Sequence, residues 1–80
     1  MPGKQLSSHA RDVLVERNIS EDWVWQAVNS PDKTWRGADG NFHFAKQIYE
    51  RQQRVLHVVL DDSTDPLTIV TVFFDRRLQL

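Results

Sequence analysis

The sequence predicts an α+β domain in which two N-terminal helices pack on one face of a four-stranded antiparallel meander sheet. Its first half holds two amphipathic segments with capping residues, and its second half holds apolar runs of strand length joined by turn signals. Sequential strands with short connections usually pair in order, which favours the meander. The chain has 80 residues, enough for a single domain over residues 1–80 and too few for a second.

The first helix is predicted over residues 9–17. Residues 1–6 carry no periodic pattern and are expected to form a loose N-terminus. Ser7 or Ser8 then offers a side-chain oxygen that can cap the first turn of the helix. Asn18 suits the left-handed conformation that ends many helices.

The second helix is predicted from Ser20 to Ser30. Two acidic residues in its first turn favour the positive end of the helix dipole. Pro31 ends the helix because proline removes a backbone donor and biases the preceding residue away from helical angles.

Four strands are predicted after the helices, at residues 33–36, 42–49, 54–61 and 67–75. A four-residue turn before the third strand sets Lys46 opposite His57, and a five-residue loop before the fourth sets His57 opposite Thr71. The opposite face of the last two strands is more uniformly apolar, so we assign it to the helices. Lys46, His57 and Thr71 are then expected together on the uncovered face.

Composition limits the classes of function. The formal net charge is −1, so any nucleic-acid site must be local rather than spread over the whole surface. The absence of cysteine excludes disulfides and thiolate metal sites and favours the cytoplasm. No apolar run approaches the length of a membrane span, so we expect no membrane partner.

The order of residues resembles that of a bacterial family. The matching segments are 9–10, 15–20, 28–32, Gly40, Lys46, 56–61 and 69–73. On these segments the chain resembles the family called domain of unknown function 4258. The resemblance implies a small fold similar to RelE-type and barnase-like ribonuclease toxins. The family pattern usually has glycine at the position of Asn18, and asparagine tolerates the same left-handed conformation.

Three residues are candidates for catalysis. RNA cleavage without metal needs a proton acceptor for the ribose 2′-hydroxyl, a cation or donor for the phosphate, and an acid for the leaving oxygen. His57 can exchange protons near neutral pH, and Lys46 beside it can stabilise phosphate charge. His9 is added because it matches the family pattern. The structural alternative is a half-buried strand histidine, a solvated lysine and a histidine that satisfies a local backbone group.

Six further residues are candidates for binding RNA: Arg17, Arg51, Arg54, Thr71, Arg76 and Arg77. The arginines at positions 51, 54, 76 and 77 could form a track for phosphates, although solvated charge is ordinary near turns and chain ends. Arg17 is included because it matches the family pattern, and its structural alternative is to neutralise the C-terminus of the first helix. We expect no metal and no cofactor, because the histidines lack metal-site spacing and the expected register puts His43 on the face opposite His57.

Two functions remain open. The first is a toxin-like ribonuclease that hydrolyses RNA, alone or on the ribosome, and is held in check by a protein partner such as an antitoxin. The alternative is a non-catalytic interaction module or regulator with a toxin-like fold, which the near-neutral charge favours. A homodimer fits both, because a domain of this length has little stability to spare.

Overall fold

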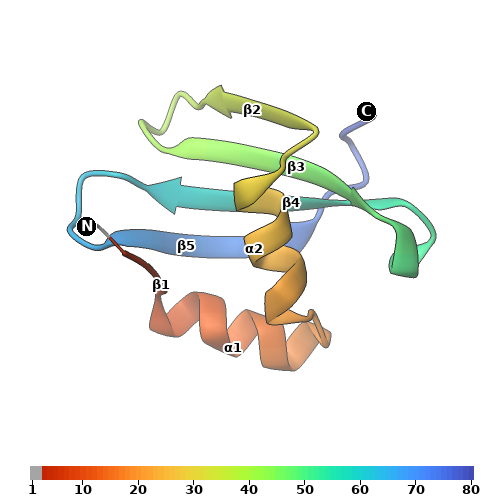
Figure 1. The fold of residues 1–80 in the computed structure, drawn as a ribbon, viewed down its shortest axis with the longest axis horizontal. Coiled ribbons are helices and arrows are strands. Elements are labelled where there is room, and N and C mark those ends of the chain that lie inside the picture. Colours follow the sequence, from red (N-terminus) through yellow and green to blue (C-terminus); the bar gives the residue numbers. More distant parts are fainter. Residues whose placement is uncertain (1–2) are drawn as a thin grey trace.

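The computed structural model describes residues 3–80 as one layer of sheet with two helices against it (Figure 1). The elements are β1 (Lys4–Leu6), α1 (Ser8–Arg17), α2 (Glu21–Asn29), β2 (Lys33–Arg36), β3 (Phe42–Ile48), the 3-10 helix η1 (Tyr49–Arg51), β4 (Arg54–Asp61) and β5 (Leu67–Phe74). The strand order across the five-stranded sheet is β1-β5-β4-β3-β2. β1 and β5 are parallel, and the other neighbouring pairs are antiparallel.

The prediction of a four-stranded, wholly antiparallel sheet is wrong. Residues Lys4–Leu6, expected to be loose, form a fifth strand and run parallel to the start of β5. A strand of three residues shows no periodicity, and Gln5 lies 63 residues before its partner Thr68. Local sequence patterns therefore gave no sign of this pairing.

Both predicted helices are confirmed, and α1 begins at a cap that also ties it to the sheet. The Ser7 hydroxyl oxygen accepts the Ala10 N–H at 3.0 Å, and the hydroxyl donates to the Val70 carbonyl at 3.0 Å. Asn18 adopts the expected left-handed conformation, with φ of 54°. Its backbone N–H and that of Ile19 return to carbonyls near the end of α1, which closes the helix.

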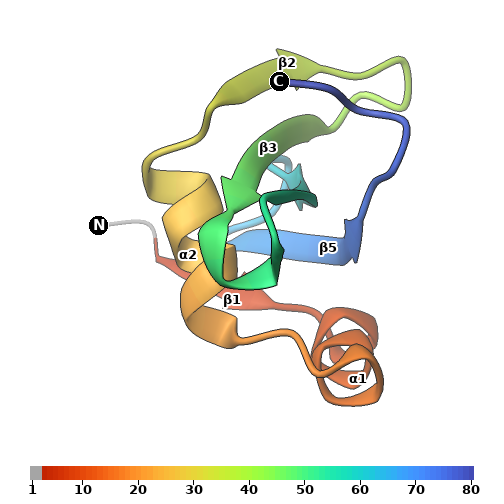
Figure 2. The ribbon, with the colours of Figure 1, turned by 90° about the vertical axis from the view of Figure 1, so that its right-hand side faces the viewer.

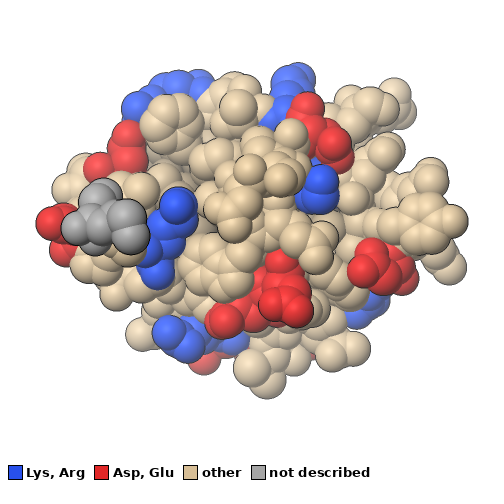
Figure 3. All heavy atoms as spheres, viewed as in Figure 1, with Lys and Arg blue, Asp and Glu red and all other residues tan. Residues whose placement is uncertain are grey.

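The hydrophobic core lies between the helices and one face of the sheet, as expected. The helices contribute Ala10, Leu14, Val24, Ala27 and Val28, and the strands contribute Leu6, Ile48, Leu56, Val58, Leu60, Ile69 and Val72. No helix among residues 3–80 is both long and apolar enough to cross a bilayer. On the side shown in Figure 3, positive and negative side chains are interspersed, with no broad surface of one sign.

The other face of the sheet is partly crossed by the C-terminal segment, residues 75–80. Figure 2 shows this segment leaving β5 and rising toward β2 on the side of the sheet away from α2. The Asp75 N–H donates to the Val55 carbonyl at 2.9 Å, which fixes the start of the segment beside β4. The second face of the sheet is therefore partly covered by the chain's own C-terminal residues.

Candidate functional site

The pairing of β3 with β4 differs by one residue from the expected register. Ala45, rather than Lys46, lies opposite His57. The connection is one residue longer than expected, because η1 begins at Tyr49 and is followed by Gln52 and Gln53 at positive φ. A slip of one residue moves every side chain of a strand to the other face.

Lys46 is therefore not beside His57, and that expected pair is wrong. Lys46 lies opposite Leu56, on the side of the sheet that carries the helices. Its Nζ donates to the Ser30 carbonyl at 2.9 Å, where α2 ends. The ammonium group thus satisfies a helix terminus and has no role in a cluster with His57.

The pairing of β4 with β5 also differs from expectation. His57 lies opposite Phe73, and Thr71 lies opposite Val59. An irregularity between Val59 and Leu60 inserts one extra residue, Val70, on the β5 side. Thr71 remains on the same face as His57 but is displaced from it along the strand.

The change in register brings His43 onto the face of His57 and creates a chain of four polar groups. His43 Nδ1 lies 2.7 Å from His57 Nε2. The other nitrogen of His57, Nδ1, lies 3.1 Å from Asp75 Oδ2, and His43 Nε2 lies 3.1 Å from Asp39 Oδ1. We call these four residues the histidine network. Each of its four ring nitrogens has a polar partner.

The histidine network is buried at one end and open at the other. The side chains of Asp75 and His57 are 6% and 10% exposed, whereas that of Asp39 is 48% exposed. The Trp35 ring stacks on His43 with 5.2 Å between centroids, and Phe73 lies 4.7 Å from His57. These aromatic rings replace water around the imidazoles, which strengthens the hydrogen bonds inside the network.

Both carboxylates of the network are held in the ionised form. Burial acts to raise the pKa of Asp75, but hydrogen bonds from His57 and the Arg77 N–H outweigh it and lower that pKa. The Asn41 N–H, followed by the bond to His43, lowers the pKa of Asp39. Each outer ring nitrogen of the histidine pair therefore faces a negative charge.

Four of the arginines expected to bind RNA converge on one pocket of about 360 Å³ near the C-terminal end of β5. We call it the arginine pocket, and its lining residues are Arg17, Ile19, Arg51, Arg54, Phe73, Phe74 and Arg76. Within residues 3–80, none of these arginines forms an ion pair with a carboxylate. Arg51 donates to the Asn18 carbonyl at 2.7 Å, and the Arg54 guanidinium lies 4.8 Å from the Phe74 ring centroid. The pocket is thus rich in positive charge that the surrounding chain does not neutralise.

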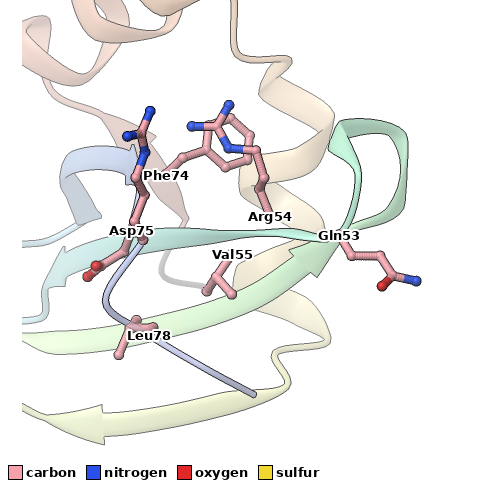
Figure 4. A pocket seen from close by; sticks show the side chains of 7 residues that line it. Gln53, Arg54, Val55, Phe74, Asp75 and Leu78 are labelled. Carbon is pink, nitrogen blue, oxygen red and sulfur yellow. The ribbon is translucent and has the colours of Figure 1, made fainter.

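A second pocket, of about 260 Å³, adjoins the arginine pocket, and Asp75 of the histidine network is one of the residues that line it (Figure 4). We call it the tail pocket, and it is lined by Gln53, Arg54, Val55, Phe74, Asp75, Arg76 and Leu78. Arg54, Phe74 and Arg76 line both pockets. The arginine pocket is therefore linked to the histidine network in two ways. Asp75 of the network lines the adjoining tail pocket, and Phe73 contacts His57 and also lines the arginine pocket.

The remaining site candidates lie elsewhere. His9 is exposed in the first turn of α1 and has no polar side-chain contact with the histidine network. Arg77 is 88% exposed and lies 3.6 Å from Asp75, outside the arginine pocket. Thr71 does not line that pocket either. Across residues 3–80, no group of three or more His, Cys, Asp or Glu is arranged to hold a metal ion.

Comparison with known proteins identifies the family. The model of the family described as Domain of unknown function (DUF4258) matches residues 6–74. The chain belongs to the DUF4258 family. No curated protein and no solved structure gives a match to the DUF4258 chain. The resemblance noted in the sequence is thereby confirmed at the level of the family.

Sequence reasoning missed three of the four residues in the histidine network of this DUF4258 chain. His43 was assigned to the wrong face, Asp39 was not among the site candidates, and Asp75 was predicted as the last residue of the fourth strand. One signal was available, because His43 and His57 lie on neighbouring strands. Side chains alternate between the two faces of a sheet, so one of the two alternating registers puts both histidines on the same face. Gln52 and Gln53, both at positive φ, set the length of the connection and hence the register, and glutamine is rarely found in this conformation.

Proposed function

We propose that this protein is a metal-independent endoribonuclease that holds the RNA backbone in the arginine pocket. One observation carries the proposal: four guanidinium groups without carboxylate partners among the described residues converge on one pocket near the C-terminal end of β5. The planar guanidinium group matches the geometry of phosphate and is weakly hydrated, which makes arginine well suited to contact nucleic-acid backbones. This local site is compatible with the chain's formal net charge of −1.

The histidine network is the best source of proton transfer near that pocket. It takes the place of the expected set of Lys46, His57 and His9, whose members do not meet. The residue opposite His43 is Val59, five positions along β4 from Arg54. At roughly 3.3 Å per residue, Val59 is about 17 Å along β4 from Arg54, one of the residues that line the arginine pocket. An RNA strand anchored by the arginines would have to run along the uncovered face to reach the network.

The alternative is a non-catalytic interaction module, and one observation favours it. All four ring nitrogens of the histidine pair already have protein partners, as expected for a network that holds the sheet face together. In that case the arginine pocket would bind an acidic segment of a partner protein.

An antitoxin-like protein partner, action on the ribosome, a homodimer and a cytoplasmic location are further parts of this proposal. The arginine pocket is the surface that such an inhibitor would have to cover with acidic side chains. The lack of cysteine suits a reducing compartment.

Binding of a fluorescent single-stranded RNA, followed by anisotropy, tests the role of the arginine pocket. The test variant is Arg17→Ala/Arg76→Ala, because neither side chain has a hydrogen bond within residues 3–80 that the fold depends on. The matched control is Lys4→Ala/Arg11→Ala, which removes the same charge from exposed positions outside the pocket. We expect the test variant to weaken RNA binding at least tenfold and the control to change it less than twofold. Equal losses in both variants would overturn the assignment.

Cleavage is tested separately on the same RNA, in a chelating buffer, with and without translating ribosomes. We expect RNA fragments from the wild-type protein and none from His43→Gln, provided circular dichroism shows that the variant is folded. Binding without cleavage in either assay would contradict the ribonuclease and favour the interaction module.

A further inference from the structure

We propose that Nε2 of His43 is the atom that exchanges a proton with the substrate. His57 and Asp75, on the buried side of His43, hold its ring in place through hydrogen bonds. The catalytic part of this inference rests on the proposed ribonuclease function. The placement of the protons follows from the contacts alone. It therefore can be tested even if the protein cuts no RNA.

The hydrogen bonds of the network fix the number of protons it can hold. Each outer ring nitrogen faces an ionised carboxylate and must donate an N–H, while the central contact between His43 Nδ1 and His57 Nε2 needs one shared proton. Three protons on four ring nitrogens make one imidazolium and one neutral imidazole. A fourth proton would place two N–H groups against each other at 2.7 Å.

The two ends of the network differ in what happens when one proton is removed. Loss from His57 Nδ1 would leave Oδ2 of the Asp75 carboxylate, whose side chain is 6% exposed, without its donor, and only Oδ1 would keep the Arg77 N–H. A buried carboxylate oxygen without a donor is costly, because water cannot reach it. Loss from His43 Nε2 leaves Asp39, which is 48% exposed and is readily solvated. The proton therefore leaves from the outer nitrogen, His43 Nε2.

This asymmetry also fixes the tautomers of the deprotonated pair. Asp75 holds the proton on His57 Nδ1, so His57 Nε2 must be the acceptor in the central bond. His43 then keeps its proton on Nδ1 and presents a bare lone pair at Nε2. The arrangement turns His43 Nε2 into a base whose orientation is set by residues behind it.

Charged groups around the pair come from three segments. Asp39 approaches from the β2–β3 turn, and Asp75 with Arg77 approaches from the C-terminal segment. Lys33 lies over the Trp35 ring at 5.5 Å from its centroid, and that ring stacks on His43. Of these groups, Asp39 alone contacts the outer nitrogen, and its place is the one that a substrate hydroxyl can take.

The corresponding step balances without a cofactor. The ribose 2′-hydroxyl gives its proton to His43 Nε2, and its oxygen uses the freed electron pair to bond to phosphorus. The bond from phosphorus to the 5′-oxygen breaks, and that oxygen keeps the electron pair and takes a proton from water. The proton on His43 returns to solvent at Asp39. The phosphate ends as a cyclic 2′,3′-phosphodiester.

Nitrogen NMR of protein labelled with ¹⁵N-histidine tests where the protons are. As the pH rises, we expect His43 Nε2 to change from the protonated to the unprotonated signal while His57 Nδ1 stays protonated. The Asp39→Asn variant should show the same change at lower pH, by a few tenths of a unit, because an exposed carboxylate has been removed. Titration at a His57 nitrogen, with His43 Nε2 fixed, would overturn the inference.

The activity measurement separates a positioning role from a purely structural one. In Asp39→Asn, we expect the rising limb of the pH–rate profile to move in the same direction and by the same amount as the NMR signal. A uniform loss of rate with an unmoved profile would contradict the role of His43 Nε2 as the base. Absence of any cleavage would overturn the catalytic part and, with it, the proposed ribonuclease, while the NMR result would still decide the proton placement.

Discussion

His43 and His57 face each other from neighbouring strands, with 2.7 Å between Nδ1 of the first and Nε2 of the second. The contact lies on the face of the sheet that the helices do not cover. On the helical face the strands are held against the core by apolar side chains. On this face a line of hydrogen bonds from Asp39 to Asp75 joins the β2–β3 turn, two strands and the C-terminal segment.

Replacement of Asp75 by asparagine should lower the free energy of unfolding at neutral pH and make that free energy less dependent on pH in the acid range. The pKa of Asp75 is lowered in the folded protein, so its ionised form stabilises the fold above the unfolded value of about 3.9. That stabilisation is lost as the pH falls through the lower folded value. We expect Asp75→Asn to cost about 2 kcal/mol at pH 7, because a charged hydrogen bond is lost. Urea unfolding from pH 7 to pH 3 measures both effects.

Asp12→Asn is the control for that experiment, because Asp12 is exposed on α1 and makes no side-chain hydrogen bond or ion pair within residues 3–80. It should change the free energy of unfolding by less than about 0.5 kcal/mol. If Asp75→Asn and Asp12→Asn behaved alike, the network would contribute nothing to the fold.

Replacement of Gly37 by alanine should disturb the histidine network, whereas replacement of Gly40 should not. A Cβ at Gly37 would collide with the His43 ring and lie 2.7 Å from Asp39 Oδ1. Gly40 has φ of 85° and nothing within 4 Å, so alanine there costs only backbone strain of about 1 kcal/mol. Histidine NMR signals should change in Gly37→Ala and persist in Gly40→Ala. Unchanged signals in both would show that the turn does not hold His43 in place.

The two helix starts should respond differently to the same substitution. The Ser7 side chain caps α1 and also bonds the Val70 carbonyl, whereas Ser20 makes no side-chain cap bond at α2. Ser7→Ala should cost about 1 to 2 kcal/mol, and Ser20→Ala only a few tenths. Thermal unfolding of the two variants measures the difference. Equal losses would contradict the assigned cap.

RNA binding should weaken with salt in proportion to the arginines that contact phosphate. Removing Arg17 alone should lower the slope of log K against log salt by about 0.7 to 1, the amount expected for one phosphate contact. Removing Arg11, on the same helix but outside the pocket, should leave the slope unchanged. Titrations at several salt concentrations give both slopes. An unchanged slope for Arg17→Ala would place the RNA elsewhere.

The helices were predictable because single residues in the local sequence determine where each helix begins and ends. Ser7, Asn18 and Pro31 each restrict the backbone through a hydrogen bond, a left-handed angle or a missing donor. The approximate limits of β3, β4 and β5 followed from apolar runs and turn residues for the same reason.

The registers were not predictable, because they depend on where individual residues fall in the connections. Gln52 and Gln53 both take positive φ, and Val70 is the extra residue of a bulge, although none of the three is typical of such a position. One added residue moved Lys46 away from His57 and brought His43 to it. The arginine pocket was predictable in part, because four of its arginines were recognised as candidates before their convergence was known.

Asp75 lies one residue beyond the span that matches the family, which ends at position 74. A fragment trimmed to that span would keep both helices and β2 to β5, but it would lose most of β1 and leave the imidazole of His57 without its carboxylate partner. Cloning boundaries and fusion tags at this end of the protein therefore alter its chemistry as well as its length.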